Sequence, residues 1–188
     1  MIRPSPSIPH TLVRTALSAA VVLTALAPPA AVAQAPAGYL EEWTQQFEAS
    51  ARKFVALAEA MPAGTYDWRP AEGVASVAEV FMHIARYNYY YPDTSLDVDP
   101  PAGMDYDALQ GVVNDKAAVV PILAESMDHV RRVVREMGEA DLQSTTRLYG
   151  RDVGEYAVLL QLLTHMNEHL GQSIAYARSN GVTPPWSG

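Results

Sequence analysis

The chain has 188 residues, of which 49% are hydrophobic and 18% charged, and this composition excludes a disordered or fibrous protein. Its 13 Lys and Arg residues against 21 Asp and Glu residues give a net charge of −8, so nucleic acid is not an expected partner. Cysteine is absent, which excludes disulfides, thiolate ligands and a cysteine nucleophile. Any bound metal must therefore use His, Asp or Glu side chains.

The first 33 residues have the order of a secretory signal peptide. A basic start is followed by the apolar stretch 15–27 and by a small-residue run that ends at Ala33. We therefore predict cleavage after Ala33 and export of residues 34–188 to the periplasm or the extracellular space. The apolar stretch is shorter than the roughly 20 residues that a membrane-spanning helix needs, so no stable membrane anchor is expected after cleavage. An uncleaved anchor is the alternative interpretation.

Amphipathic patterns in the rest of the chain predict four helices and an all-α fold. Their expected bounds are 39–61, 76–91, 115–137 and 152–180. Ser76, followed three residues later by Glu79, predicts a capping box at the start of the second helix. No segment alternates at period two over the length of a strand. The long connection 92–114 between helices 2 and 3 predicts a crossover, and hence a four-helix bundle that is not simply up-down-up-down.

Three histidines fall on the predicted inner faces of helices. His165 and His169 are four residues apart on the core-facing stripe of the fourth helix, and His83 lies in the equivalent stripe of the second. Two inward histidines are too polar for an ordinary core, and imidazoles one turn apart can converge on one ion. Three neutral imidazoles would suit zinc, nickel or iron. The alternative is that His165 and His169 are bundle histidines whose hydrogen bonds are satisfied within the protein, and that His83 is unrelated to them.

Other polar residues near these histidines are candidates for a role in a site. Glu79 and Tyr87 lie one turn before and one turn after His83, where they are candidates for proton transfer or substrate contact. For Glu79 the capping role is the alternative. Gln172 is a candidate for holding a ligand histidine in one tautomer. His129 competes with an apolar stripe on the third helix, and we expect it on the surface rather than among the ligands.

Two longer motifs contain the three histidines. The first, Y-D-W-R-P-A-E-G-V-A-S-V-A-E-V-F-M-H-I-A, covers residues 66–85. The second, H-x-x-x-H-x-G-Q followed by Y-x-R-x-N-G and P-P-W, covers residues 165–186. Together the two motifs resemble the signatures of the DinB-like (DinB/YfiT) superfamily, and the resemblance extends over residues 38–188. It implies a four-helix bundle with three metal-ligating histidines, which are His83, His165 and His169.

The resemblance also implies a class of reaction. Characterised relatives include thiol-dependent transferases and isomerases that use bacillithiol, mycothiol or glutathione, so a low-molecular-weight thiol is an expected partner beside a small-molecule substrate. We therefore predict an exported metal-dependent transferase or hydrolase that acts through metal-bound thiol or water. The alternative is a non-catalytic metal-binding or structural bundle protein. A homodimer is left open.

Overall fold

The computed structural model describes residues 34–111 and 115–187, and four long helices dominate it. They are α1 (Tyr39–Ala60), α2 (Val77–Leu96), α4 (Lys116–Glu136) and α5 (Glu155–Ser179). The predicted all-α fold class is confirmed. The predicted signal peptide falls on residues 1–33, outside the described residues. Within the described residues, no helix combines the length and the apolarity that a bilayer span requires.

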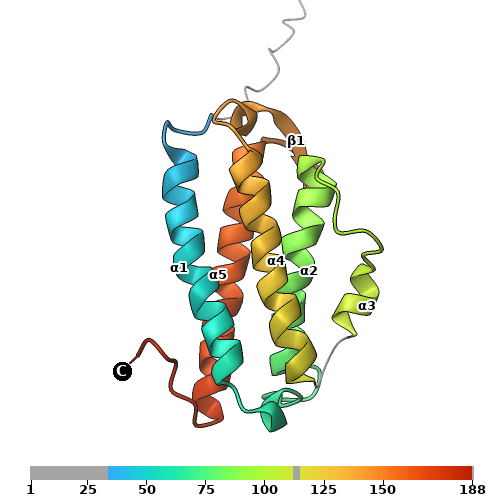
Figure 1. Ribbon diagram of the computed structural model, residues 1–188, viewed down its shortest axis with the longest axis vertical. Coiled ribbons are helices and arrows are strands. Elements are labelled where there is room, and N and C mark those ends of the chain that lie inside the picture. Colours follow the sequence, from blue (N-terminus) through green and yellow to red (C-terminus); the bar gives the residue numbers. More distant parts are fainter. Residues whose placement is uncertain (1–33, 112–114, 188) are drawn as a thin grey trace, which may run out of the picture. The chain divides into compact units, whose positions relative to one another are not determined.

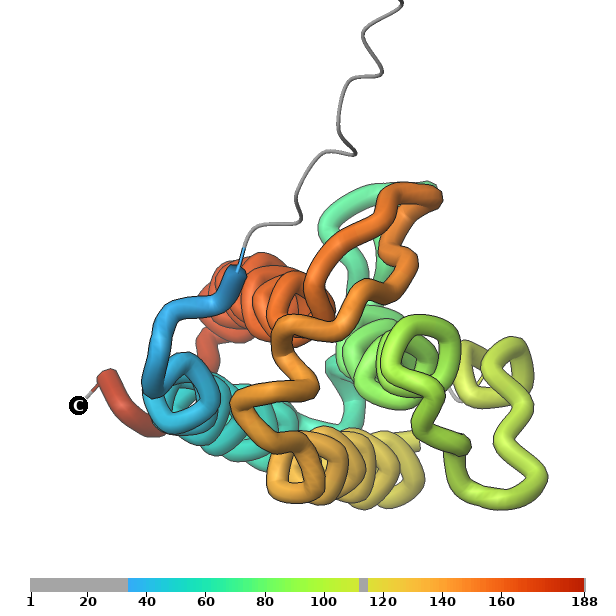
Figure 2. The backbone as a smooth tube through the Cα atoms, turned by 90° about the horizontal axis from the view of Figure 1, so that it is seen from above, coloured from blue at the N-terminus to red at the C-terminus, as the bar shows by residue number. Residues whose placement is uncertain are grey.

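The crossover between α2 and α4 sets the topology of the bundle (Figure 1). α2 runs back along α1, the crossover then returns to the end where α2 began, and α4 runs parallel to α2. The crossover contains the short helix α3 (Tyr106–Gln110), which packs against α2. Viewed along the bundle, α2 lies beside α4 and α5, and α1 lies beside the same two helices from the other side (Figure 2). The seam between α2 and α5 is therefore one of the contacts between neighbouring helices of the bundle.

Aromatic side chains of α1 join that helix to its neighbours. Trp43 stacks on Phe47 with ring centroids 5.0 Å apart, and its indole N–H donates to the carbonyl oxygen of Leu159 in α5 at 2.7 Å. Phe54 meets Phe81 of α2 edge to face at 5.7 Å. Each of these side chains is buried, and burial of one large apolar side chain contributes about 1.5–3 kcal/mol. The core is thus continuous from α1 to the seam that holds the histidines.

The prediction that the fourth helix begins at residue 152 is wrong, because a β-hairpin stands there. Strands β1 (Thr145–Leu148) and β2 (Arg151–Gly154) pair antiparallel, and α5 starts at Glu155. Tyr149 and Gly150 join them with φ values of 52° and 75°, which is the left-handed pair that a two-residue hairpin turn uses. Asp152 does not cap a helix but pairs with Arg147 across the hairpin at 3.0 Å. Strands of four residues are too short to show a clear period-two pattern.

The second helix is longer than predicted. α2 continues through Pro92 and ends at Leu96, where Asp97 adopts a left-handed φ of 55°. Proline inside a helix removes one hydrogen bond and normally costs about 3 kcal/mol. Here Pro92 and Ser95 are buried, and the Ser95 carbonyl accepts from the Thr146 hydroxyl of β1 at 2.5 Å. Packing against the hairpin therefore offsets the local cost and extends the helix by more than a turn.

Candidate metal centre

The start of α2 is fixed by several hydrogen bonds, one turn before His83. The Ser76 hydroxyl accepts from the Glu79 amide at 3.2 Å, and the Glu79 carboxylate accepts from the Ser76 amide at 2.5 Å, so the predicted capping box is confirmed. The amides of Val77 and Ala78 donate to carbonyl oxygens of the preceding loop at 3.0 and 2.9 Å. All these amides are orphan donors of a helix start, so their partners hold α2 in place.

The three predicted histidines meet at the seam between α2 and α5. One ring nitrogen of each of His83, His165 and His169 lies within 4.8 Å of the other two. The Nε2 atoms of His83 and His165 are 3.0 Å apart, and the ring centroids of all three pairs lie 4.8–4.9 Å apart. All three side chains are half-buried. They form a group that could hold a metal ion.

The donor set fits a divalent metal ion. Two nitrogens bound to one tetrahedral zinc ion at about 2.0–2.1 Å lie roughly 3.3 Å apart, close to the observed separation of the His83 and His165 nitrogens. Burial and the neighbouring histidines lower the pKa of His165 to about 4, and burial is also the main cause that lowers the pKa of His83. Both imidazoles are therefore neutral near pH 7, which is the form that binds a metal.

An aromatic wall covers one side of the histidine cluster. Tyr87, a predicted site residue, places its ring centroid 4.7 Å from that of His83 and 4.9 Å from that of His165. Tyr91 packs against the same Tyr87 ring at 5.0 Å, and its hydroxyl hydrogen-bonds to that of Tyr149 at the tip of the hairpin. The hairpin that the sequence did not predict thus completes the wall.

A cavity of about 360 Å³ opens beside the cluster, and Tyr87 is not among the residues that line it. It is lined by Ala75, Glu79, Val80, His83, Gln110, His169 and Gln172. Gln110 comes from α3 in the crossover, and no sequence pattern indicated its place at the site. A small molecule in this cavity would contact two of the three histidines.

Glu79 lines this cavity but is held by other groups. Its carboxylate accepts from the Ser76 amide and lies 3.3 Å from the Arg69 guanidinium. The hydrogen bond from the Ser76 backbone is the main cause that lowers the pKa of this carboxyl group, with a further contribution from Arg69. Glu79 is therefore ionised near pH 7, and the capping role that the sequence left as an alternative is present in the structure.

Gln172 lies against a histidine of the cluster, as predicted. Its Oε1 atom is 2.7 Å from His169 Nδ1, and its Nε2 atom donates to the Tyr176 hydroxyl at 2.8 Å. No site role was predicted for Tyr176. The spacing contained a signal, since His169, Gln172 and Tyr176 follow one another at intervals of three and four residues, which align side chains on one helix face.

His129 is buried, and the prediction that it lies on the surface is wrong. Its side chain is 4% exposed and packs against Tyr89 with ring centroids 4.9 Å apart. Its Nε2 atom is buried without a hydrogen-bond partner among the described residues, and burial lowers the pKa of its imidazole. His129 is not part of the three-histidine group.

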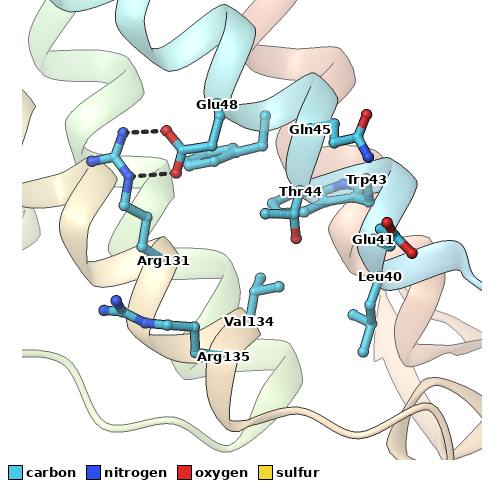
Figure 3. Close-up of a pocket in the computed structure, with 10 residues that line it drawn as sticks. Leu40, Glu41, Trp43, Thr44, Gln45, Glu48, Arg131, Val134 and Arg135 are labelled. Atoms are coloured by element: carbon cyan, nitrogen blue, oxygen red, sulfur yellow. Dashed lines mark hydrogen bonds and ion pairs between the residues drawn. The ribbon is translucent and has the colours of Figure 1, made fainter.

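A second cavity, of about 380 Å³, lies between α1 and α4, away from the histidines (Figure 3). Its walls include Leu40, Trp43 and Val134, and a bidentate ion pair of Arg131 with Glu48 stands at one end, with nitrogen–oxygen distances of 2.7 and 2.9 Å. None of the three clustered histidines lines it. The chemistry of the candidate site is thus confined to the seam between α2 and α5.

Comparison with solved structures shows where this fold occurs. The chain is similar to a DinB-like protein from Bacillus cereus, with 18% identity and a TM-score of 0.65 over 80% of this chain and 96% of that one. A DinB-like protein from Bacillus subtilis, YjoA, matches with 20% identity and a TM-score of 0.59 over 76% and 93% of the two chains. A conserved protein from Enterococcus faecalis matches with 16% identity and a TM-score of 0.56 over 73% and 94%. At these identities the likeness shows a shared fold.

Comparison at the level of sequence families agrees with this fold. No protein of curated function matches the chain. The family model of the DinB superfamily matches residues 46–177, which is more than half of the chain and includes all three clustered histidines. The chain therefore belongs to the DinB superfamily.

Proposed function

We propose that this protein is an exported metal-dependent transferase or hydrolase that acts on a small molecule. The observation that carries the proposal is the group of three half-buried imidazoles beside a cavity of about 360 Å³. Neutral ligands leave the full charge of a divalent ion to act on whatever occupies its remaining position. When bound, such an ion supplies positive charge that lowers the pKa of a thiol or a water molecule toward neutrality.

The protein's own residues would bind the ion and handle the proton. His83, His165 and His169 would ligate the ion, and Gln172 would hold His169 from outside the ligand set. Glu79 faces the cavity as a carboxylate, so its role there would be to accept a proton or a hydrogen bond. Tyr87 packs against His83 and His165 and would exclude water from that part of the cluster.

The contacts that the Glu79 carboxylate already makes support a metal site with an open coordination position, rather than a structural site closed by four protein ligands. A structural zinc ion is normally bound by four protein ligands, whereas a catalytic one keeps a position for water or substrate. The described residues offer three clustered ligands, and the nearby Glu79 carboxylate is occupied by the helix cap and by Arg69. A substrate bound at the open position would extend into the cavity that Gln110 helps to line.

Screening of electrophilic and hydrolysable small molecules, with and without added thiols, tests this proposal. Turnover that requires a thiol indicates transfer, and turnover without one indicates hydrolysis. The His165→Ala variant is the blank, and His129→Ala is the matched control because it removes a buried histidine outside the cluster. A metal with four protein ligands and no exchangeable position would refute the proposed enzymatic function. The alternative, a non-catalytic metal-binding or structural bundle protein, would then hold.

Export is proposed from the residue pattern of the first 33 positions. The mature chain would begin at Gln34, because the small residues Ala31 and Ala33 fit the requirement for signal cleavage. Intact mass spectrometry of the protein purified from its native compartment tests this. A mass that includes residues 1–33 would contradict cleavage and indicate an anchored domain instead.

A further inference from the structure

A line of contacts connects His169 to the loop that begins α2. The oxygen of the Gln172 carboxamide lies 2.7 Å from His169 Nδ1. The nitrogen of the same carboxamide lies 2.8 Å from the Tyr176 hydroxyl oxygen. The Tyr176 ring meets the Trp68 ring edge to face, with centroids 5.3 Å apart and an angle of 76°. Tyr176 is only 7% exposed. The amide of Gln172 is therefore held at both ends, by a histidine of the cluster and by a buried phenol.

The direction of this amide is coupled to the position of the proton on His169. With the amide oxygen toward the ring, Nδ1 must carry the proton, and Nε2 keeps its lone pair for an ion. With the amide reversed, the Gln172 nitrogen would donate to Nδ1 and the proton would sit on Nε2. That tautomer cannot bind a metal through Nε2. The observed network, in which the Gln172 nitrogen donates to Tyr176, corresponds to the tautomer that can bind.

We propose that Tyr176 is a positioning residue of the metal centre. In the observed network its hydroxyl accepts from the Gln172 amide nitrogen and anchors that side chain with the amide oxygen facing His169 Nδ1, an arrangement that leaves His169 Nε2 unprotonated. A free glutamine side chain has several rotatable bonds and would lose this alignment, because ordering it costs conformational entropy. The inference deepens the proposed function, on which it rests for the identity of His169 as a ligand.

Trp68 connects this hydrogen-bond network to α2, the other helix that carries a candidate ligand. Its carbonyl oxygen accepts from the amide of Val77, the first residue of α2, at 3.0 Å. The same residue thus supports the start of α2, which carries His83, and the phenol that aligns His169 on α5. This arrangement gives the Tyr176 ring a fixed place, so that the hydroxyl is presented at a constant position to the amide.

A packing role for Tyr176 is distinguished from a positioning role by removing the hydroxyl alone. Tyr176→Phe keeps the ring and its contact with Trp68 but takes away the acceptor for Gln172. Tyr66→Phe is the matched control, because Tyr66 is also buried and its hydroxyl donates to the Ala58 carbonyl at 2.7 Å, outside the histidine network. Each variant loses one hydrogen bond of a buried tyrosine, and only Tyr176→Phe changes the histidine network.

Two measurements on these variants test the inference. The first is the dissociation constant for zinc ion, which we expect Tyr176→Phe to raise roughly threefold to tenfold, since residues directly behind a ligand contribute 10–100-fold. The second is the pair of ¹⁵N chemical shifts of His169 in the metal-free protein, which report which nitrogen carries the proton. We expect the Nδ1–H form in the wild type and a mixture of tautomers in Tyr176→Phe. Tyr66→Phe should match the wild type in both.

Variants of Gln172 give an independent check if Tyr176→Phe does not fold. A carboxylate can only accept hydrogen bonds, so Gln172→Glu should keep the Nδ1–H tautomer and zinc affinity, whereas Gln172→Leu should lose both. Equal zinc affinity and unchanged His169 shifts in Tyr176→Phe would overturn the inference, as would equal values for the two Gln172 variants. If the wild type binds no zinc while Tyr176→Phe still changes the tautomer, the proposed function fails, and Tyr176 aligns His169 without serving a metal centre.

Discussion

The Nε2 atoms of His83 and His165 lie 3.0 Å apart, although 82 positions separate the two residues in the chain. One nitrogen must donate a proton to the other in the absence of an ion, since two unprotonated nitrogens at this distance would repel each other. Two protonated imidazoles are excluded for the same reason, because like charges this close strongly disfavour each other. Protons and cations therefore act at the same place in this protein, the two Nε2 atoms of this histidine pair.

We expect each chain to bind one divalent metal ion through this cluster. His165→Ala and His169→Ala should weaken binding by more than about 100-fold, because groups behind the ligands alone contribute 10–100-fold and these changes remove a ligand itself. His83→Ala should weaken binding as well. Metal analysis and calorimetric titration of the purified variants measure this. His129→Ala should bind like the wild type, and equal loss there would show that the ligand set is wrong.

The metal-free protein should lose stability in acid. Burial lowers the pKa of His165 in the folded chain to about 4, whereas an unfolded histidine titrates near 6.5. Between these values the unfolded state binds more protons, so the free energy of unfolding rises with pH in this window. Stability should thus be full above about pH 6.5 and fall toward pH 4. Urea unfolding with a chelator at several pH values measures it, and a flatter profile is expected for His165→Phe. A wild-type stability that increases in acid would contradict the assignment.

The capping box should contribute to stability without taking part in metal binding. Ser76→Ala removes the acceptor for the Glu79 amide and should lower the free energy of unfolding by about 1 kcal/mol, the usual cost of losing a helix cap. The stoichiometry of bound metal should not change. Chemical unfolding provides the measurement, with Ser144→Ala as control, since Ser144 is exposed and its hydroxyl has no hydrogen bond to the described residues. Equal stability of the two variants would argue against the cap.

The turn of the hairpin should depend on its glycine. Gly150 has a φ of 75°, where a side chain costs roughly 1–2 kcal/mol, so Gly150→Ala should destabilise the fold by about that amount. Gly64→Ala is the control, because Gly64 has no left-handed φ and an added methyl group there would meet no atom within 4 Å. Thermal unfolding of both variants checks the difference. A larger loss at Gly64 would mean that the turn is not as described.

Where local signals were strong, the sequence predicted the structure well. The Ser76 and Glu79 pair located the start of α2, and the four-residue spacing of His165 and His169 placed both on one helix face. These features depend on residues close together in the chain. Helix periodicity then made it possible to expect His83 on the facing stripe, since the apolar faces of two helices in a bundle must meet.

The features that were missed depend on contacts between distant segments. Pro92 normally ends a helix, and only the packing of the hairpin against α2 explains why the helix continues. Tyr149 adopts a left-handed φ that its residue type does not indicate. Gln110 reaches the site because α3 packs on α2, which no periodic pattern shows. The burial of His129 depends likewise on Tyr89 of another helix.

The order of the elements along the chain has a consequence for how the protein would acquire its ion. Two of the three clustered histidines, together with Gln172 and Tyr176, lie on α5, which follows the other three long helices. A chain that emerges with its N-terminus first, from a ribosome or a translocation pore, therefore presents His83 alone until the 25 residues of α5 appear. His83 and His165 are 82 positions apart, so at synthesis rates of about 5–20 residues per second this interval lasts roughly 4 to 16 seconds. A nascent chain within that interval has one ligand and no site, so metal capture would follow completion of the bundle and could not guide it.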